Sequence, residues 1–532
     1  MNASGSRLSR RNFIKHCATA AAGGQVAALA AQQRSQRSNP DRPPNILIYM
    51  NDQQQGFTVH PGHPCRMPNV ERLAREGILF RNMRTVAAHC CPSRASFLTG
   101  LYPSGHGVFN NVQTATAIHI GLNKECGTYS EQLKKAGYRL VWSGKWHVSI
   151  EEGPADRGFE MAGNQRGHGH PSTQIERARA RIERWRKTPK NPEGTAPRGR
   201  GELIRPGWYR YRLYGTRPPN PKTDPFNPGD LRIVTDALNS LKELLNSDTP
   251  WLLYCGPNGP HDPYIIPEYY AKMYDPKDVQ LPPNYRDSFE DKPRIYQRQR
   301  QYWAQLSDDE VREAIAHYWG YCTMQDDLFG LLLEELDRSD QRDNTVVMYL
   351  SDHGDYVGAH GLFMKGVPCF EEAYRVPAVI RWPKGIRNPG RIVDAPVSHV
   401  DFAPTIIELA GAEPLSYCHG RSLVPFFKDE APPDWPDAAF TQFNGVELYY
   451  SQRQVITERW KYVYNGFDFD ELYDLQEDPH ETRNLARERG MEKVIREMVE
   501  RMWVHAARTD DFIFNPYGTV ALAPFGPKIA EF

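Results

Sequence analysis

The sequence lacks several features that would place it at once in a common functional class. It has 65 basic and 65 acidic residues, so the formal net charge is zero and nothing indicates a nucleic-acid partner. None of its nine cysteines belongs to a Cys-x-x-Cys pair, so a zinc ribbon is not supported and no disulfide can be assigned. Beyond the N-terminal segment, no continuous apolar run reaches the length of a membrane span. The 532 residues are nevertheless enough for a large core and one smaller domain.

The N-terminal segment has the pattern of an export signal. Arg10-Arg11 stands within Ser-Arg-Arg-Asn-Phe-Ile-Lys, and a weakly apolar, Ala/Gly-rich stretch leads to a candidate cleavage site at Ala28-Leu29-Ala30. We therefore predict a twin-arginine signal peptide over residues 1–31 and a polar linker over 32–42. This implies a periplasmic or secreted protein with the twin-arginine translocase as a partner; the alternative is a disordered basic leader.

Four short apolar runs each end in polar residues of the kind that bind ligands. The runs at 45–50, 138–144, 251–257 and 344–351 are typical of strands buried on both faces. Helical patterns lie between them, and strands that alternate with helices predict a mostly parallel sheet. Because ligands of such sheets bind beyond the carboxyl ends of the strands, we expect these polar groups to converge on one site. They are Asn51-Asp52-Gln53, Lys145-Trp146-His147, Pro260-His261-Asp262 and Asp352-His353-Gly354.

One helical pattern also predicts which face packs on the sheet. In LRIVTDALNSLKELLN, residues 231–246, apolar side chains recur at helical spacing. The predicted buried face carries Leu231, Val234, Leu238, Leu241 and Leu245.

The residue types in the four polar groups suggest a metal site that handles an anion. Asp52 and Asp352 offer oxygen ligands to a hard cation, with Gln53 and His353 beside them. A single aspartate at such a place is usually a helix cap or a turn residue. The coincidence of four groups favours the functional interpretation.

Cations and titratable groups complete that chemistry. Lys145 and Lys365 supply positive charge for an anion with several oxygens, and His147 and His261 can move protons near neutral pH. A single lysine or histidine at a strand end is more often an exposed loop residue, so this interpretation also depends on the coincidence.

Several motifs resemble those of the formylglycine-dependent sulfatases, within the alkaline phosphatase superfamily. CCPSRASFLTG, residues 90–100, matches the signature Cys-x-Pro-Ser-Arg-x-x-x-Leu-Thr-Gly, and GYRLVWSGKWH resembles the second signature. SDHGDYVGAHGLFMKG and YRVPAVIRWP resemble the metal-binding and following segments, and ELYDLQEDPHETRNLA resembles the C-terminal ending. The match runs from about residue 43 to 490.

The resemblance implies an α/β fold with an alkaline-phosphatase-like, mostly parallel central sheet flanked by helices. The catalytic domain would span residues 43–430, and a smaller C-terminal α+β subdomain with its tail would span 431–532.

The resemblance also explains the two adjacent cysteines. It implies that a formylglycine-generating enzyme oxidises Cys90 to formylglycine (3-oxoalanine), and that Cys91 is the variable position and an inert thiol. We expect Pro92 and Ser93 to open a helix through Leu98, whose N-terminal amides would favour an anion beside residue 90.

The roles of the remaining residues are likewise implied by the resemblance. The hydrated aldehyde at residue 90 would attack the sulfur of a sulfate ester, His261 with Lys365 would protonate the departing alcohol, and His147 would take a proton to release sulfate. Arg94 would bind the hydrated aldehyde, and Lys145 and Lys365 would neutralise the sulfuryl oxygens. The implied metal is calcium, with Mn²⁺ or Mg²⁺ as alternatives, held by Asp52, Gln53, Cys90, Asp352 and His353.

Two departures from the commonest family pattern keep other functions open. Many members have two aspartates at Asp52-Gln53 and Asp-Asn at Asp352-His353, whereas phosphonate monoester hydrolases and choline sulfatases resemble this chain there. One alternative is therefore a phosphonate monoester or phosphodiester hydrolase. Others are an inactive relative that binds sulfated glycans, and a phosphatase that uses the Cys90 thiolate.

The organic part of the substrate is not specified by the motifs. We expect a sulfated glycan or small molecule, recognised by loops within 160–228; the alternative for this segment is an exposed, solvated loop without that role. The apolar tail, residues 511–532, is expected to dock on a partner subunit or to cover the pocket, and the oligomeric state stays open. The candidate specificity residues are His168, His170, Trp208 and Arg210.

Overall fold

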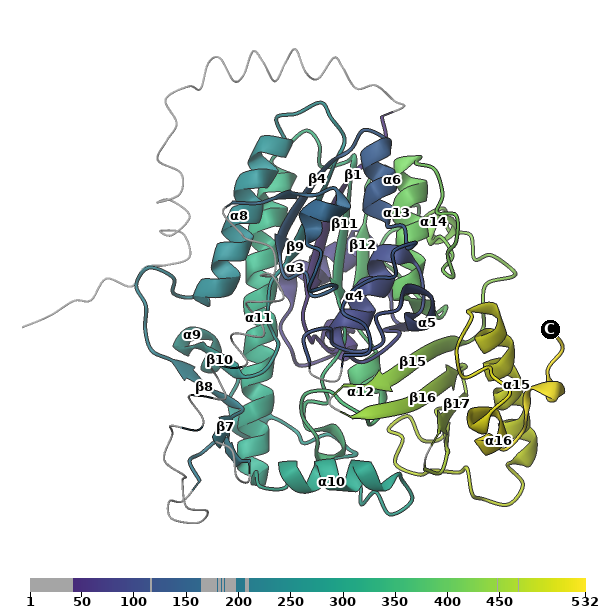
Figure 1. The fold of residues 1–532 in the computed structure, drawn as a ribbon. Coiled ribbons are helices and arrows are strands. Elements are labelled where there is room, and N and C mark those ends of the chain that lie inside the picture. The colour runs from purple at the N-terminus through teal and green to yellow at the C-terminus, as the bar shows by residue number, and fades with distance from the viewer. Residues whose placement is uncertain are drawn as a thin grey trace, which may run out of the picture. The chain divides into compact units, whose positions relative to one another are not determined.

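An eight-stranded sheet forms the centre of the fold (Figure 1). The computed structural model describes residues 42–114, 117–163, 198–205, 210–446, 448–466 and 468–532, with residues 179, 183 and 186. The predicted signal peptide and nearly all of the predicted linker lie outside these residues. From edge to edge, the strands are β13 (Arg391–Val393), β2 (Ile78–Phe80), β12 (Ala378–Arg381), β11 (Thr345–Ser351), β1 (Asn45–Asn51), β9 (Trp251–Gly256), β4 (Arg139–Gly144) and β5 (Glu160–Met161).

The four predicted strands, β11, β1, β9 and β4, are consecutive neighbours in this sheet. β1 pairs in parallel with β11 and with β9, and β4 pairs in parallel with β9 and with β5. Only β12 runs antiparallel, against β11 and β2, among the paired strands of this sheet in the described residues. The prediction of a mostly parallel sheet is confirmed.

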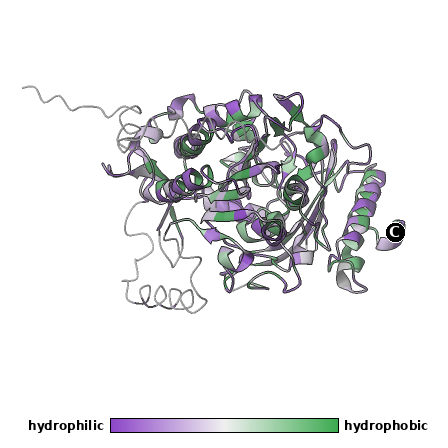
Figure 2. Ribbon diagram, turned by 90° about the horizontal axis from the view of Figure 1, so that it is seen from above, coloured by the Kyte–Doolittle hydropathy of each residue, from purple (hydrophilic) through white to green (hydrophobic). Residues whose placement is uncertain are grey.

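Helices cover both faces of the sheet because the side chains of β1 alternate between two apolar cores. Leu47 and Tyr49 pack with α3 (Pro68–Arg75), α8 (Pro228–Leu244) and α11 (Asp308–Asp337). Ile46 and Ile48 point to the opposite core, with α4 (Cys90–Thr99), α6 (Tyr129–Lys135) and α13 (Phe402–Ala410). Seen from above, the surrounding helices carry hydrophobic and hydrophilic sides (Figure 2).

The buried face of α8 is rotated from the predicted one. Ile233, Val234, Ala237, Leu241 and Leu244 are buried within this helix, whereas Leu231 and Leu238 are only half-buried. Ile233 and Ala237 take the central positions because the helix lies over β4 and β9, and Ser143 of β4 donates to the carbonyl of Ile233. The periodicity therefore identified the helix and a face whose five residues all pack against the core, although the most deeply buried line is centred on Ile233 and Ala237.

A second, antiparallel sheet forms the C-terminal region. Its order is β15 (Ala439–Gly445), β16 (Tyr449–Ile456), β17 (Trp460–Asn465) and β18 (Glu471–Asp474). The helix α15 (Glu492–Arg508) packs on it through Met498, Met502 and Trp503. This agrees with the expected C-terminal α+β subdomain, whereas the boundary at residue 430 stays a prediction.

The C-terminal tail packs on its own chain. Nε1 of Trp503 donates to the carbonyl of Phe525 at 2.8 Å, and the rings of Phe514 and Phe532 lie 5.3 Å apart. Asp511 pairs with Arg453 of β16, the nearest atoms being 2.5 Å apart. The tail is thus held by its own subdomain, but Phe512, Tyr517, Leu522 and Phe532 stay exposed, so the two expected roles remain predictions.

Short elements connect these layers. No helix within the described ranges combines the length and apolar character needed to cross a bilayer. The short elements are β3 (Met83–Arg84), α5 (Pro103–His106), β6 (Glu202–Ile204), β7 (Arg210–Arg212), β8 (Tyr214–Arg217), β10 (Tyr264–Pro267), α9 (Glu268–Ala271), α10 (Arg294–Trp303), α12 (Glu371–Tyr374), β14 (Val397–Ser398), α14 (Val424–Phe427) and α16 (Gly518–Leu522).

Candidate active site

The polar groups that follow β1, β9, β4 and β11 meet at one edge of the sheet. Because these strands are neighbours and parallel, their carboxyl ends lie side by side. Asp52 follows β1 and bridges to Pro260 in the loop after β9, and Lys145, directly after β4, reaches Asp52. The backbone N–H of Gln53 also donates to Asp352, 299 positions away, so residues far apart in the sequence are in direct contact.

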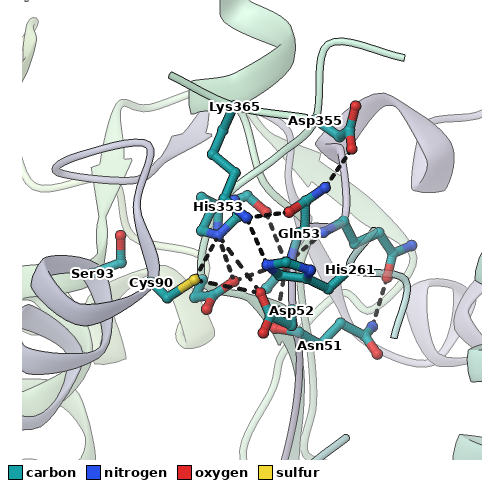
Figure 3. Close-up of polar contacts among 12 residues, drawn as sticks. Asn51, Asp52, Gln53, Cys90, Ser93, His261, His353, Asp355 and Lys365 are labelled. Carbon is teal, nitrogen blue, oxygen red and sulfur yellow. Dashed lines mark hydrogen bonds and ion pairs between the residues drawn. The ribbon is translucent and has the colours of Figure 1, made fainter. Parts of the chain in front are cut away.

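Four buried side chains form a cluster with the donor set of a metal site. Asp52, Cys90, Asp352 and His353 each place a ligand atom within 4.8 Å of the other three. Sγ of Cys90 lies 3.1 Å from Nε2 of His353 and 3.7 Å from Oδ1 of Asp52 (Figure 3). Two carboxylates and an imidazole can bind a divalent cation together, so this donor set fits one.

Two cations balance the carboxylates of the cluster. Lys145 binds Oδ2 of Asp52, and Nε of Arg94 donates to Oδ2 of Asp352 at 2.7 Å. Burial alone would raise the pKa of Asp52, but Lys145 and His261 hold it well below its usual value. Burial would likewise raise the pKa of Asp352, and Arg94 reverses this. Both carboxylates are therefore held in the ionised form that a metal requires.

His353 is held in its neutral form, which is the form that can bind a metal. Burial lowers its pKa, and Asp352 opposes this only in part. Nδ1 lies 2.9 Å from the carbonyl oxygen of Gly354, which places the proton of the neutral ring on Nδ1. Nε2 then offers its lone pair on the side of Cys90.

The helix α4 presents Cys90 as its first residue. His89 is the N-cap, so the helix begins two residues before the predicted start at Pro92. Proline is accepted there because the amides of the first turn have no intrahelical acceptor to lose. Cys91 faces the core beneath the helix, and burial raises its pKa, which agrees with an inert thiol.

Arg94 lies one turn further along α4. Its Nη1 donates to Oη of Tyr254 at 2.9 Å, and its Nη2 has no hydrogen-bond partner among the residues that the structure describes. A buried guanidinium N–H without a partner is costly, so a ligand oxygen beside Cys90 would satisfy it. The Asp352 and Tyr254 contacts of Arg94 had no signal in the sequence.

His261 and Lys365 form a pair at the mouth of the cluster. Nζ of Lys365 lies 2.7 Å from Nε2 of His261, and Nδ1 of His261 lies 2.7 Å from the carbonyl oxygen of Asp262. His261 is more exposed than the metal cluster, with 30% of its side-chain surface accessible. The pair can therefore contact the leaving group of a substrate that enters the site from solvent.

Gln53 stands between the metal cluster and this pair. Its backbone N–H donates to Oδ1 of Asp352, and its φ of 70° turns the side chain inward. Its Oε1 accepts from Lys365, while its Nε2 donates to Asp355 and Asp262. Asp355 and Asp262 stand in motifs that the sequence singled out, but nothing in the pattern indicated their contact with Gln53.

His147 lies just past the carboxyl end of β4, two residues beyond Lys145. It is buried and has a φ of 57°. Its expected role as a base rests on the resemblance of the segment that ends in GKWH to the second signature of the family.

The structure describes only part of residues 160–228, the segment expected to recognise the organic part of the substrate. His168, His170 and Trp208 lie outside the described residues. Nη1 of Arg210 lies 3.5 Å from a carboxylate oxygen of Glu202, in the small β6–β7 sheet. The neighbouring Tyr211, which the sequence did not single out, donates to Oδ2 of Asp262 at 2.5 Å and so connects this segment to the site.

A second group of potential ligands lies between α12 and the C-terminal region. His360, Glu372 and Glu481 place ligand atoms within 4.8 Å of one another. However, Nζ of Lys461 already lies 2.6 Å from Glu481, and Nδ1 of His360 pairs with Asp287 at 2.7 Å. Because these protein partners already balance the charge, we interpret this group as a structural network.

Comparisons with known proteins match most of the chain, including the segments that form this site. The sulfatase family model matches residues 44–412, and a model described as the C-terminal part of N-sulphoglucosamine sulphohydrolase matches 358–508. An uncharacterized sulfatase, YidJ of Escherichia coli, is 29% identical, with 83% of each chain covered. An N-acetylglucosamine-6-O-sulfatase of Bacteroides thetaiotaomicron is 27% identical, covering 89% of this chain and 88% of the relative.

A solved structure shows the same fold. A phosphonate monoester hydrolase from Silicibacter pomeroyi superposes with a TM-score of 0.70 and 23% identity, covering 88% of this chain and 96% of that chain.

Proposed function

Because the chain belongs to the sulfatase family and is a sulfuric ester hydrolase, we propose that it cleaves sulfate esters of a carbohydrate, using formylglycine at residue 90 and one divalent cation. The observation that carries the proposal is the cluster of Cys90, Asp52, Asp352 and His353 at the start of α4. It places the residue of the modification motif directly against a metal-binding donor set.

The cation would be held by Asp52, Asp352, His353, Gln53 and the modified residue 90. When bound, it would supply positive charge that polarises the sulfate and activates the side chain of residue 90. Calcium is the proposed ion, with Mn²⁺ or Mg²⁺ as alternatives, since Gln53 and His353 make the set less negative than one of four carboxylates.

The remaining side chains would bind the sulfate group and move its protons. Lys145, Arg94 and Lys365 bring three positive charges to the cluster, where they orient and neutralise the sulfuryl oxygens. His261, with Lys365, delivers a proton to the leaving alcohol, and His147 removes the proton that releases sulfate. Positioning and electrostatics, rather than a strong acid or base, carry most of this chemistry.

The carbohydrate part of the proposal is supported by a relative's name. The relative from Bacteroides thetaiotaomicron is an N-acetylglucosamine-6-O-sulfatase. The alternative is a phosphonate monoester hydrolase, favoured by Gln53 and His353 among the candidate ligands and by the structural likeness to one.

A substrate comparison separates these functions. We would measure kcat/KM for 6-O-sulfated N-acetylglucosamine, choline sulfate, nitrophenyl sulfate and a phenyl phosphonate monoester, after producing the protein with a formylglycine-generating enzyme. The proposal expects the highest value for a sulfated sugar. A phosphonate ester turned over faster than every sulfate would contradict it.

We also propose export by the twin-arginine translocase. Replacing Arg10 and Arg11 with lysine keeps the charge but removes the arginine pair, and should leave the protein in the cytoplasm. Cell fractionation measures this, and normal periplasmic yield from the double variant would contradict the proposal.

A further inference from the structure

The side-chain amide of Gln53 is held in one orientation by neighbours on both sides (Figure 3). Its Nε2 lies 2.5 Å from Oδ2 of Asp355 and 3.1 Å from Oδ1 of Asp262, so each of its two hydrogens has a carboxylate acceptor. On the other side, Oε1 accepts from Nζ of Lys365. A flipped amide would place Oε1 against two carboxylates and Nε2 against an ammonium group, which is unfavourable on both sides.

Asp355 is itself fixed as an acceptor. Its Oδ1 accepts from the backbone amides of Val357 and Met364, each at 2.9 Å, and its Oδ2 accepts from Gln53 and from Oη of Tyr264, each at 2.5 Å. The side chain is completely buried, so no solvent competes for these four donors. The Asp355 carboxylate therefore cannot turn to accommodate another orientation of Gln53.

We propose that Asp355 is a positioning residue, which fixes the amide of Gln53 so that Oε1, and not Nε2, faces Lys365 and the proposed metal ligands. This inference rests on the proposed function, because it assigns Gln53 as the ligand whose oxygen must point toward the cation. It also connects the metal cluster to the proton-delivering pair, since the same Oε1 holds Lys365 beside His261. The hydrogen bonds of the Asp355 side chain go to Gln53, Tyr264, Val357 and Met364, so it would act on the cation through Gln53.

The test inverts the polarity of this contact. In Asp355→Asn, the amide oxygen must keep the Val357 and Met364 bonds, because an NH₂ group there would meet two N–H donors. Nδ2 of the new asparagine then faces Gln53. If Gln53 keeps its orientation, two NH₂ groups meet, and if it flips, its NH₂ meets Lys365.

The compensating change is Gln53→Glu. Alone, it places a new carboxylate against Asp355 and Asp262, which should weaken the site. Combined with Asp355→Asn, it restores the net charge of the site and leaves only Asp262 opposed to the new carboxylate. Glu at 53 can then accept from the new NH₂ group with one oxygen while offering the other to Lys365 and the cation.

Metal affinity is the main measurement, made by calorimetric titration of the EDTA-treated full-length protein with Ca²⁺ and with Mn²⁺. Asp355→Asn should weaken binding about 10- to 100-fold, as expected when a ligand loses the group that orients it. The double variant should bind more tightly than either single variant. Asp326→Asn is the matched control, because Asp326 is also completely buried and accepts three N–H bonds, from Asn69 and Val70, away from the cluster.

Unchanged affinity in Asp355→Asn, or a double variant that binds no better than Asp355→Asn, would overturn the inference. Equal weakening in Asp326→Asn would overturn it too, because the effect would then be that of any buried carboxylate. Only recovery in the double variant, with Asp326→Asn unchanged, supports a positioning role.

Unfolding midpoints in EDTA separate this inference from the proposed function. The hydrogen bonds of Gln53 exist without an ion, so the double variant should also be more stable than the sum of the two single effects predicts. If the wild-type protein binds neither cation but this recovery is seen, the metal part of the proposed function fails while the orientation of Gln53 stands. Additive losses of stability would overturn the orientation itself.

Discussion

Nζ of Lys365 lies 2.7 Å from Nε2 of His261, so one hydrogen is shared between the two nitrogens. Nδ1 of His261 lies 2.7 Å from the carbonyl oxygen of Asp262, which can only accept, so Nδ1 carries a proton. Nε2 of a neutral His261 then accepts from the Lys365 ammonium group. In the proposed mechanism, the proton for a leaving alcohol would come from this lysine–histidine pair rather than from an isolated imidazolium.

His261→Ala should lose activity according to the quality of the leaving group. Without the pair, a sugar or alkyl alkoxide must leave unprotonated, and we expect kcat/KM to fall ~10²- to 10⁴-fold. A nitrophenolate leaves readily without a proton, so the loss on nitrophenyl sulfate should be much smaller. Equal losses on both substrates would show that His261 does not deliver the proton.

Lys365→Ala is the companion variant, and it should behave differently. In the proposed mechanism Lys365 also neutralises sulfuryl oxygens, so its removal should reduce kcat/KM on both substrates. A loss confined to the alkyl sulfate would assign Lys365 to proton delivery alone.

The two adjacent cysteines provide a matched pair for testing the modification. Cys90→Ala should abolish activity because it removes the precursor of the nucleophile, whereas Cys91→Ala should retain most of it, since Cys91 points into the core. In active protein, mass spectrometry should find the Cys90 peptide lighter than its thiol form and reactive with hydrazides. Full activity from protein whose Cys90 is unmodified would contradict the mechanism and favour a thiolate.

The sequence predicted the centre of the fold better than its edges. The runs that became β1, β4, β9 and β11 are continuous and apolar because both faces of those strands are covered, so local composition is sufficient. β2 and β12 are three and four residues long, and their antiparallel pairing comes from the sheet rather than from any local pattern.

The sequence predicted the site residues that stand in recognisable motifs. It did not predict those whose part in the site depends on contacts between distant segments. Cys90 and the strand-end residues stand in recognisable segments, and the parallel sheet brings them together. The start of α4 at Cys90 and the roles of Asp355 and Tyr211 depend on side chains far apart in sequence, whose distances no periodicity encodes.

Glu310 should give the stability of the fold a pH dependence at the acid end. It caps α11 and pairs with Arg198, with two N–O distances of 2.6 Å. Burial would raise its pKa, but Arg198 and backbone amides lower it from 4.5 to about 2. A lowered pKa means that the contribution is complete above pH 4.5 and is lost as the pH falls toward 2.

Glu310→Gln should therefore destabilise the protein at pH 7 by about 2 kcal/mol, the scale of hydrogen bonds to a charged group. The difference from wild type should shrink as the pH falls from 5 toward 3, measured by urea unfolding. Glu334→Gln, on the same helix, is the control, because Glu334 and its partner Arg338 are 48% and 65% exposed and such surface pairs contribute about 0.5 kcal/mol. A pH-independent difference for Glu310→Gln would contradict the assignment.

His147→Ala should slow the release of sulfate rather than the departure of the alcohol. If His147 takes the proton that frees sulfate, its removal leaves the first half of the reaction intact, so each active site should release one alcohol in a rapid burst before turnover slows. The slow phase should be equally slow on nitrophenyl sulfate and on an alkyl sulfate, and intact-protein mass spectrometry after the burst should find sulfate retained by the chain. His261→Ala is the matched comparison, because it impairs the earlier step and should show neither burst nor retained sulfate on the alkyl substrate. The outcome that contradicts this assignment is a His147→Ala protein with no burst on nitrophenyl sulfate and with a loss of kcat/KM that is larger for the poorer leaving group. The roles assigned to the two histidines would then have to be exchanged.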